Sequence, residues 1–267
     1  MQPIETLSSD GFVVYRGVLS NDAANAARII ARRSHLPWTN EDDSSPRLRR
    51  VSARVPPIPG FLLSIILERY IHTFFPGMDQ SKLEWCYLKS YADAPDQPTH
   101  RDFAVSRYTI DPMDVASLPS SLLIATQDDT VVYGYGWNHH VAFQSDQVVI
   151  RLKKGDLLFM RGDFIYSRAG YTWNNLCIHT FLGEITTRPH FRGQLVPCYD
   201  DKPTVNAHDG TCYVLGCRFV GNTDHALRMH LRSCHNVFIQ SFSRCARSND
   251  PRIAAAEAEI INLADDF

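Results

Sequence analysis

Along residues 1–75, the order of apolar and polar positions predicts two helices, one strand and one loop. Residues 11–18 (GFVVYRGV) are rich in β-branched and aromatic side chains, which favours a short strand. The Ser-Asn-Asp sequence at 20–22 supplies N-cap residues for a helix through AANAARIIARR. Residues 40–60 are polar, basic and proline-rich, so they predict a solvated surface loop. A second helix is expected over about residues 61–75, ending before a Pro-Gly pair.

From Leu83 to Glu184 the pattern changes to short apolar runs separated by turn residues. These runs are WCYLKSY, SLLIATQ, TVVYGYG, VAF, QVVIRL, DLLFM, DFIYS and LCIHTFL. Many short strands with turn signals between them are typical of a β-sandwich or barrel. A parallel α/β fold is disfavoured, because no helical pattern separates the runs. The chain is therefore expected to be mainly β with flanking helices.

The C-terminal part has a different composition. Residues 185–210 are irregular and proline-rich, and the following segment is rich in Cys, His and Arg. An Asp-Pro pair at 250 then opens an Ala/Glu/Ile-rich helix that runs to the end of the sequence. The pattern thus predicts a β-rich domain over residues 1–200, a small module over 201–249 and a C-terminal helix over 250–267.

Composition and net charge exclude several classes of protein. Hydrophobic residues make up 44% of the 267 residues and charged residues 21%, which excludes a disordered chain, a coiled coil and a collagen-like repeat. The net charge of -2 provides no global basic field for nucleic acid or anionic lipid. Seven cysteines without the spacing of a secreted framework, and an N-terminus without a signal-peptide pattern, indicate an intracellular protein, cytoplasmic or nuclear. The longest mainly apolar stretch, 61–67, is too short to span a bilayer, so no membrane partner is expected.

A Cys/His spacing in the small module predicts a zinc site. Cys212 and Cys217 are separated by four residues, and His230 follows after twelve more. Cys234 or His235 then completes a set that fits the C-x2–4-C-x12-H-x3–5-H pattern, because both are spaced for one face of a helix. Thiolates and imidazoles suit tetrahedral Zn²⁺. The module resembles a zinc finger of the two-cysteine, two-histidine type; the alternative is a set of simply buried thiols.

Nucleic-acid binding through this finger is one of two roles that the sequence leaves open. Residues 202–247 contain six Lys or Arg against two Asp or Glu, which is only mildly basic. The alternative is a structural role, in which the finger docks on the β domain. Phe219 and Leu227 are expected to form the miniature core of the finger itself. The cations that would contact phosphates are Arg228, Arg232, Arg244 and Arg247.

A second constellation of candidate ligands lies in the β-rich part. His100 and Asp102 follow a strand-like run and a proline-rich turn. Residues two apart in a strand face the same side, so an imidazole and a carboxylate can enter one cavity. Non-haem Fe(II) oxygenases hold their metal with two His and one carboxylate, which makes this pair a candidate for two of the three ligands.

Four segments of the chain, within residues 9–185, carry a family resemblance. They are SSDGFVVYRGVLS, the run from Lys89-Ser90-Tyr91 through THRDF, KKGDLLFMRGDFIYSRAGYTW and NNLCIHTFLGE. Together they resemble the 2-oxoglutarate- and Fe(II)-dependent oxygenases of the phytanoyl-CoA-hydroxylase-like group. The resemblance implies a double-stranded β-helix, that is, a cupin-like jelly roll, with Fe(II) and 2-oxoglutarate as cofactors. It places iron on His100 and Asp102, and 2-oxoglutarate near Cys177 and Tyr91. Arg168 and His179 are further candidate contacts of 2-oxoglutarate, named from their own positions and not from the family pattern.

Two positions depart from that family's pattern. The second metal histidine belongs at the end of G-D-x-x-H, where this sequence has Tyr166, and the arginine that grips 2-oxoglutarate is replaced by Cys177. A thiol cannot make the bidentate contact of a guanidinium with a carboxylate. His179 shares a face with Cys177 and is a candidate for the missing nitrogen ligand of iron or for holding the acid. Arg168 is a candidate to bind the anion in place of the missing arginine. Tyr166 is a candidate phenolate ligand of iron. The alternatives are a hydrogen-bonded interior His179 and a packed Tyr166 ring.

Three functions follow from these features. The first is an oxygenase that oxidises a C–H bond of a small-molecule or macromolecular substrate. The second is a pseudoenzyme that keeps the jelly roll as a binding or scaffold module. The third is a nucleic-acid-binding protein acting through the finger. A further histidine-rich run, Trp137-Asn138-His139-His140, lies between two strand candidates and is expected to be a loop, because adjacent histidines in an extended chain point to opposite sides.

Overall fold

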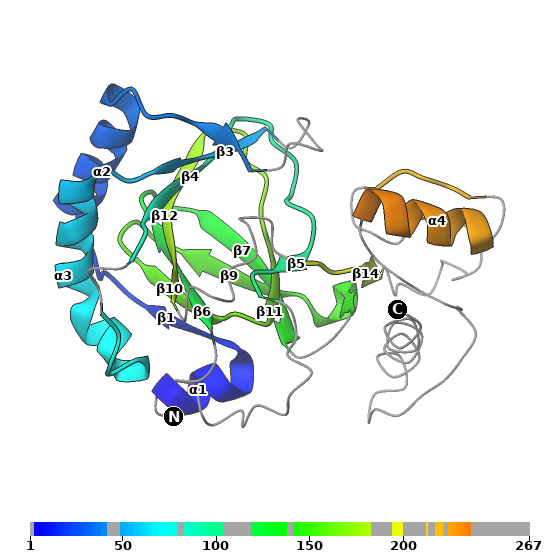
Figure 1. The fold of residues 1–267 in the computed structure, drawn as a ribbon, viewed down its shortest axis with the longest axis horizontal. Coiled ribbons are helices and arrows are strands. Elements are labelled where there is room, and N and C mark those ends of the chain that lie inside the picture. The colour runs from blue at the N-terminus through cyan, green and yellow to red at the C-terminus, as the bar shows by residue number, and fades with distance from the viewer. Residues whose placement is uncertain are drawn as a thin grey trace.

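Two antiparallel β-sheets packed face to face form the body of the protein in the computed structural model (Figure 1). The structure describes residues 3–41, 49–79, 83–103, 119–137, 141–182, 194–199, 212, 217–221 and 224–235. This mainly β architecture with few helices is the jelly roll that the sequence resemblance implies.

The larger sheet has seven strands, and its apolar residues alternate between two faces. Its order is β1 (Phe12–Tyr15), β10 (Leu157–Arg161), β6 (Ser120–Ala125), β12 (Asn175–Leu182), β4 (Cys86–Ser90), β3 (Arg50–Arg54) and β2 (Thr39–Asn40). On β12, Leu176 and Ile178 face the helices, whereas Cys177 faces the other sheet. This strict alternation, with both faces buried, fixes the register of the central strands.

The smaller sheet has five strands and closes the barrel. Its order is β13 (Gln194–Leu195), β5 (His100–Arg101), β11 (Phe164–Arg168), β7 (Thr130–Trp137) and β9 (Val148–Leu152). A short parallel pair joins β14 (Cys198–Tyr199) to β8 (Ala142–Phe143), and the 3-10 turn η4 (Gln144–Asp146) leads into β9. Phe164 and Tyr166 pack between the sheets against Leu123 and Leu158 of the larger sheet. The inner faces of the two sheets therefore share one core.

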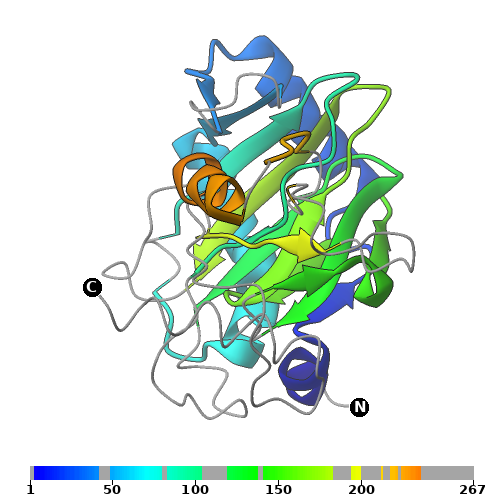
Figure 2. The ribbon, with the colours of Figure 1, turned by 90° about the vertical axis from the view of Figure 1, so that its right-hand side faces the viewer.

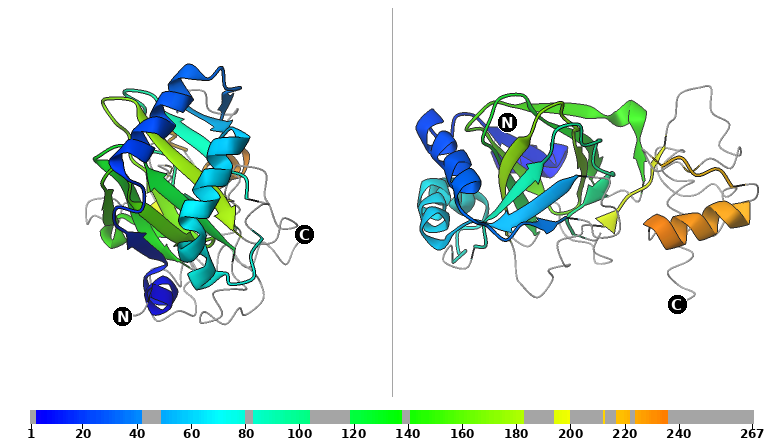
Figure 3. Two further views of the ribbon diagram at one scale, coloured as in Figure 1. Left: turned by 90° about the vertical axis from the view of Figure 1, so that its left-hand side faces the viewer. Right: turned by 90° about the horizontal axis from the view of Figure 1, so that it is seen from above.

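Three helices lie at the N-terminal side of the barrel. They are α1 (Pro3–Asp10), α2 (Asn21–Arg33) and α3 (Pro57–Phe74). Ser20 caps α2 as expected, because its side chain accepts a hydrogen bond from the Ala23 amide. Figures 1 and 3 show α2 and α3 side by side over the larger sheet. Leu67 and Ile71 of α3 are fully buried against that sheet.

The expected loop over residues 40–60 is wrong in part. Arg50–Arg54 forms β3, which pairs with β4, and α3 already begins at Pro57 rather than near residue 61. A proline is well suited to the first turn of a helix, because its missing N–H has no partner there in any case. The α1 helix was also not expected, because its short sequence lacks a clear apolar period.

The C-terminal module contributes α4 (Asp224–His235). This helix lies apart from α2 and α3, on the other side of the sheets (Figures 1 and 3), and Figure 2 views the strands from its side. The four residues between Cys212 and Cys217, and the C-terminal helix predicted over 250–267, lie outside the described residues. None of the described helices combines the length and the apolarity that crossing a membrane requires.

Candidate metal and co-substrate sites

The space between the two sheets holds the candidate iron ligands. His100 on β5 is the direct cross-strand neighbour of Tyr166 on β11, and Asp102 follows β5 directly. His179 enters from β12 of the opposite sheet. Each of these four side chains is at least nine-tenths buried. The structure thus brings together His100, Asp102, Tyr166 and His179, which come from three different segments of the chain.

The Tyr166 hydroxyl is bonded to the carboxylate. Its oxygen donates a hydrogen bond to Asp102 Oδ1 at 2.9 Å, and its ring packs on that of His100 with 4.5 Å between the ring centroids. His100 is itself fixed by a 2.9 Å contact between Nδ1 and the Pro98 carbonyl oxygen. Tyr166 therefore stands where the family pattern has a metal-binding histidine, and it occupies one oxygen of the candidate carboxylate ligand.

Protonation in this cluster favours an acceptor carboxylate and a neutral phenol. Burial opposes ionisation of Asp102, but the nearby His179 and His100 outweigh it, and its pKa lies below the ordinary value. Burial and then the Asp102 charge raise the pKa of Tyr166 well above 10.0. Burial lowers the pKa of His100, which leaves that ring neutral at neutral pH. A phenol in this state stays protonated and donates a hydrogen bond to the carboxylate, so it is a poor metal ligand.

His179 is close to the carboxylate but does not complete a metal site. Its Nε2 lies 3.9 Å from Asp102 Oδ2, and neither atom has a hydrogen-bond partner among the described residues. Ligands held about 2 Å from one metal ion lie within about 4 Å of each other. The 3.9 Å between His179 and Asp102 is within that spacing, but the position at which the family pattern has its second histidine is held by Tyr166, which is bonded to Asp102. His100 and Asp102 thus supply an imidazole and a carboxylate, and a phenol, that of Tyr166, stands beside them in place of a second imidazole.

Arg168, the candidate anion-binding residue, already has a carboxylate partner. Two residues beyond Tyr166 on β11, it is buried and forms an ion pair with Glu41, which follows β2. Its Nε also donates a hydrogen bond to Gln97 Oε1 at 2.9 Å. Although burial opposes charge, Glu41 and Tyr166 outweigh it and raise the pKa of Arg168. A carboxylate of the chain itself thus satisfies the guanidinium that would receive a carboxylate of 2-oxoglutarate.

Cys177 offers no compensating contact at the position of the family arginine. Its thiol is buried and donates a weak hydrogen bond to Asn175 Oδ1 at 3.2 Å. Burial raises its pKa to about 11, although the Arg168 and Arg50 charges act in the opposite direction. The thiol is therefore protonated at neutral pH and has no charge with which to attract an anion. In this arrangement the Arg168 guanidinium is paired with Glu41 and the Cys177 thiol carries no charge, so neither residue offers an unpaired positive charge to a carboxylate of 2-oxoglutarate.

Tyr91 is not part of this cluster. Its ring lies under the Lys89 ammonium, 4.3 Å from the ring centroid. Lys89 projects on the helix-covered side of the larger sheet, because Leu88, one residue earlier, packs between the sheets. Trp137, which was expected to lie in a loop, is the last residue of strand β7, and residues 138–140 lie outside the described residues.

The structure also shows polar residues that the sequence did not single out. Glu41 and Arg50 both belong to the segment expected to be a solvated loop. Arg50 is 3% exposed and donates hydrogen bonds to the carbonyl oxygens of Pro95 (2.8 Å), Arg168 (3.1 Å) and Ala169 (2.9 Å). Burial and then the Arg168 charge lower its pKa to about 10. No local signal identifies these two residues, because their partners come from distant strands.

The second group of candidate ligands lies in the C-terminal module. The ligand atoms of Cys212, Cys217, His230 and His235 all lie within 4.8 Å of one another. Cys217 Sγ and His235 Nε2 are each 3.1 Å from His230 Nε2. Two imidazole nitrogens that face each other at this distance repel unless a proton or a cation lies between them. The geometry thus suits a four-ligand metal site with two sulfur and two nitrogen donors.

Of the two candidates for the fourth ligand, the structure brings His235 into the group and leaves Cys234 outside it. Cys234 is exposed, and its sulfur lies 3.7 Å from Ser233 Oγ. Phe219 stacks on the His230 ring at 3.9 Å between centroids, and Leu227 is 2% exposed, as a miniature core requires. Burial and then the neighbouring His230 lower the pKa of His235 to about 4, so its ring is neutral and able to bind metal at neutral pH.

Comparison with solved structures identifies the same fold. HygX from Streptomyces hygroscopicus with nickel and 2-oxoglutarate bound matches with a TM-score of 0.53 and 13% sequence identity, over 68% of this chain and 86% of that chain. HygX with iron bound gives a TM-score of 0.50 and 12% identity over the same shares. A prolyl-4-hydroxylase from Pseudomonas putida gives a TM-score of 0.48 and 11% identity over 68% and 97%. Neither the protein-family models nor the curated proteins gave a match. The likeness extends to the fold alone.

Proposed function

We propose that this protein is a non-catalytic binding module built on the oxygenase jelly roll, stabilised by one zinc ion in its C-terminal module. The observation that carries the proposal is the hydrogen bond from Tyr166 to Asp102. It uses an oxygen of the carboxylate that would bind iron, and it comes from the residue that replaces the second metal histidine. The ion pair between Arg168 and Glu41 supports the same conclusion for 2-oxoglutarate.

An active oxygenase is the second candidate function, and one contact favours it. His179 Nε2 lies 3.9 Å from Asp102 Oδ2, so a modest movement of β12 side chains would bring a second imidazole toward His100. In that case Arg168 would have to release Glu41 to receive a carboxylate. The first candidate is preferred because it needs neither rearrangement. Nucleic-acid binding through the finger stays a prediction, since the side chains of Arg228 and Arg232 and residues 236–267 lie outside those described.

The zinc site is proposed from the four converging ligands. Zn²⁺ binds two thiolates and two imidazoles in a tetrahedron, and such a site contributes folding free energy directly. Cys212 and Cys217 would provide the thiolates, and His230 and His235 the nitrogens. In isolated fingers the apparent binding free energy is about 10–16 kcal/mol, which is far more than so small an apolar core contributes. The ligands of the jelly-roll domain would be a small molecule or a macromolecule.

Metal analysis of the full-length protein tests the proposal. Protein purified without chelator, then incubated anaerobically with Fe(II) and 2-oxoglutarate and desalted, should contain about one zinc and far less than one iron per chain. Cys217→Ser should lose the zinc. Cys234→Ser is the matched control, because it removes a neighbouring thiol that lies outside the group, and it should keep the zinc. One retained iron per chain would reject the non-catalytic assignment, whereas absence of zinc from the wild type would reject the finger.

A further inference from the structure

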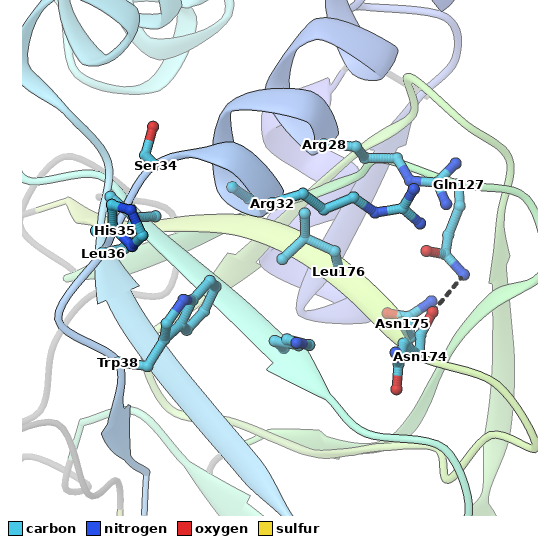
Figure 4. A pocket seen from close by; sticks show the side chains of 12 residues that line it. Arg28, Arg32, Ser34, His35, Leu36, Trp38, Gln127, Asn174, Asn175 and Leu176 are labelled. Carbon is cyan, nitrogen blue, oxygen red and sulfur yellow. Dashed lines mark hydrogen bonds between the residues drawn. The ribbon is translucent and has the colours of Figure 1, made fainter.

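A cavity lies on the opposite face of the larger sheet from the candidate iron ligands. It has a volume of about 510 Å³ and lies between the end of α2 and strands β4 and β12 (Figure 4). Leu176 and Lys89, which are cross-strand neighbours, form part of its wall. The next residue on β12, Cys177, faces the space between the sheets. The cavity and the inter-sheet cluster are therefore separated by the thickness of the sheet.

Positive charge converges on this cavity. Arg28 and Arg32 lie one turn apart on α2, and Figure 4 shows their side chains running side by side toward Gln127. Lys89 adds a third cation from β4. The lining contains no Asp or Glu. Within the described part of the chain, neither arginine forms an ion pair, unlike the buried Arg168. Three cations around one concave surface without a counter-charge favour an anionic ligand.

Polar and aromatic groups extend the wall beyond the cations. Asn174 Oδ1 accepts a hydrogen bond from the Ala92 amide at 2.8 Å, which turns its side-chain NH₂ toward other acceptors. Gln127 Nε2 donates to the Asn174 carbonyl at 3.2 Å, so its own side-chain carbonyl oxygen remains an acceptor. Trp38 is half-buried and lies across the cavity from the two arginines (Figure 4). One end of the cavity is thus suited to bind an anion, and the indole ring of Trp38 forms the surface at the other end.

We propose that this cavity binds a small phosphorylated ligand that carries a planar ring, such as a nucleotide. Arg28 and Arg32 would bind the phosphate oxygens through charge-assisted hydrogen bonds. Trp38 would contact the ring, with Lys89 between the two ends. A volume of about 510 Å³ falls in the range of about 300–1,000 Å³ that is usual for small-molecule pockets. This site goes beyond the proposed binding function by assigning a ligand class and a place.

A nucleic-acid strand is a different class of ligand, and the described surface favours it less. The cations surround a single concavity rather than forming a stripe, and the chain carries a net charge of -2. Binding of a strand normally uses an extended basic groove with several stacking side chains. One half-buried indole beside three cations matches a compact ligand instead.

Calorimetric titration of the full chain with ADP tests the proposal. Saturable binding is expected, and it should weaken as ionic strength rises. Arg28→Gln and Arg32→Gln should each weaken it by about tenfold or more, because each removes one charge-assisted contact. Arg33→Gln is the matched control, since it removes the same charge from an exposed position on α2 outside the cavity and should leave the affinity within about twofold.

Partial ligands and a strand complete the test. Ribose 5-phosphate should bind more weakly than ADP, and adenosine should not bind measurably. Far-UV circular dichroism confirms that each variant is folded. Equal weakening by all three variants, or adenosine binding as tightly as ADP, would overturn the proposal. So would binding of a single-stranded oligonucleotide without binding of ADP. Tyr166→Phe, on the other face of the sheet, should not change ADP affinity, which separates this test from that of the inter-sheet cluster.

Discussion

The hydrogen bond between Tyr166 and Asp102 predicts a specific loss of stability in Tyr166→Phe. The substitution removes one oxygen from a fully enclosed site and keeps the ring that packs on His100. Asp102 Oδ2 has no hydrogen-bond partner among the described residues, so loss of the bond to Oδ1 leaves the buried carboxylate with only the nearby His179 and His100 to stabilise its charge. Hydrogen bonds to charged groups contribute about 1.5–3 kcal/mol, and we expect the upper end of that range.

Tyr87→Phe is the matched control for this substitution. Tyr87 is fully buried, and its hydroxyl has no hydrogen-bond partner among the described residues. Burial raises its pKa to about 12, so it is neutral at neutral pH. Removing an unpaired buried hydroxyl leaves no partner behind and should be neutral or slightly stabilising. The two substitutions delete the same atom from the same residue type and differ only in what that atom contacts.

Urea unfolding at pH 7, followed by tryptophan fluorescence, measures both free energies. With a slope near 3 kcal/mol per M, a loss of about 3 kcal/mol lowers the urea midpoint by roughly 1 M. The loss should persist to pH 4 and shrink only below it, because the pKa of Asp102 lies below its ordinary value of 3.8 and the carboxylate keeps its charge until the pH falls through that pKa. A double-mutant cycle with Asp102→Asn should show coupling between the two residues. If Tyr166→Phe is as harmless as Tyr87→Phe, the closed cluster does not exist in solution.

Three further predictions concern other parts of the chain. Glu41→Gln should destabilise the protein by about 3 kcal/mol in urea unfolding, because it leaves the buried Arg168 charge without its counter-charge; a midpoint equal to the wild type would show that the pair is solvated. Gly155→Ala should lower the thermal midpoint by several degrees, since residue 155 has a φ of +87° and the new Cβ would lie 2.1 Å from the Leu19 carbonyl oxygen; an unchanged midpoint would contradict this turn. Zinc should leave as the pH falls from 6.5 toward about 4, because in that window the released His235 takes up a proton that the folded module excludes; zinc retained at pH 4 in a chelator competition would contradict the site.

Periodicity predicted the strands well because both faces of the larger sheet are buried. On β12, Leu176, Cys177 and Ile178 are three consecutive apolar residues, and turn residues mark the ends of such runs. Short elements at the barrel's edge were harder to predict. The five residues of β3 are mostly polar, and they form a strand because they pair with β4 and because Arg50 finds three carbonyl oxygens inside the fold. Tertiary partners, not local pattern, decide such segments.

The candidate site shows the same division between local and distant information. The i, i+2 spacing of His100 and Asp102 and the position of Tyr166 in G-D-x-x-Y follow from sequence, and the structure brings these side chains together. The partner of Arg168 could not be predicted, since Glu41 is 127 residues away in a segment of loop-like composition. In the C-terminal module the spacing admitted both Cys234 and His235, and only the three-dimensional course of α4 separates them.

Turnover of 2-oxoglutarate by the wild-type protein tests the central claim most directly. Succinate is measured after incubation with Fe(II), ascorbate and 2-oxoglutarate, beside the double variant Tyr166→His with Cys177→Arg. The closed Tyr166–Asp102 contact and the Arg168–Glu41 pair predict no succinate above the protein-free background for the wild type, and tighter Fe(II) binding by the double variant. Robust wild-type turnover would contradict the account and would assign the missing roles to His179 and Arg168.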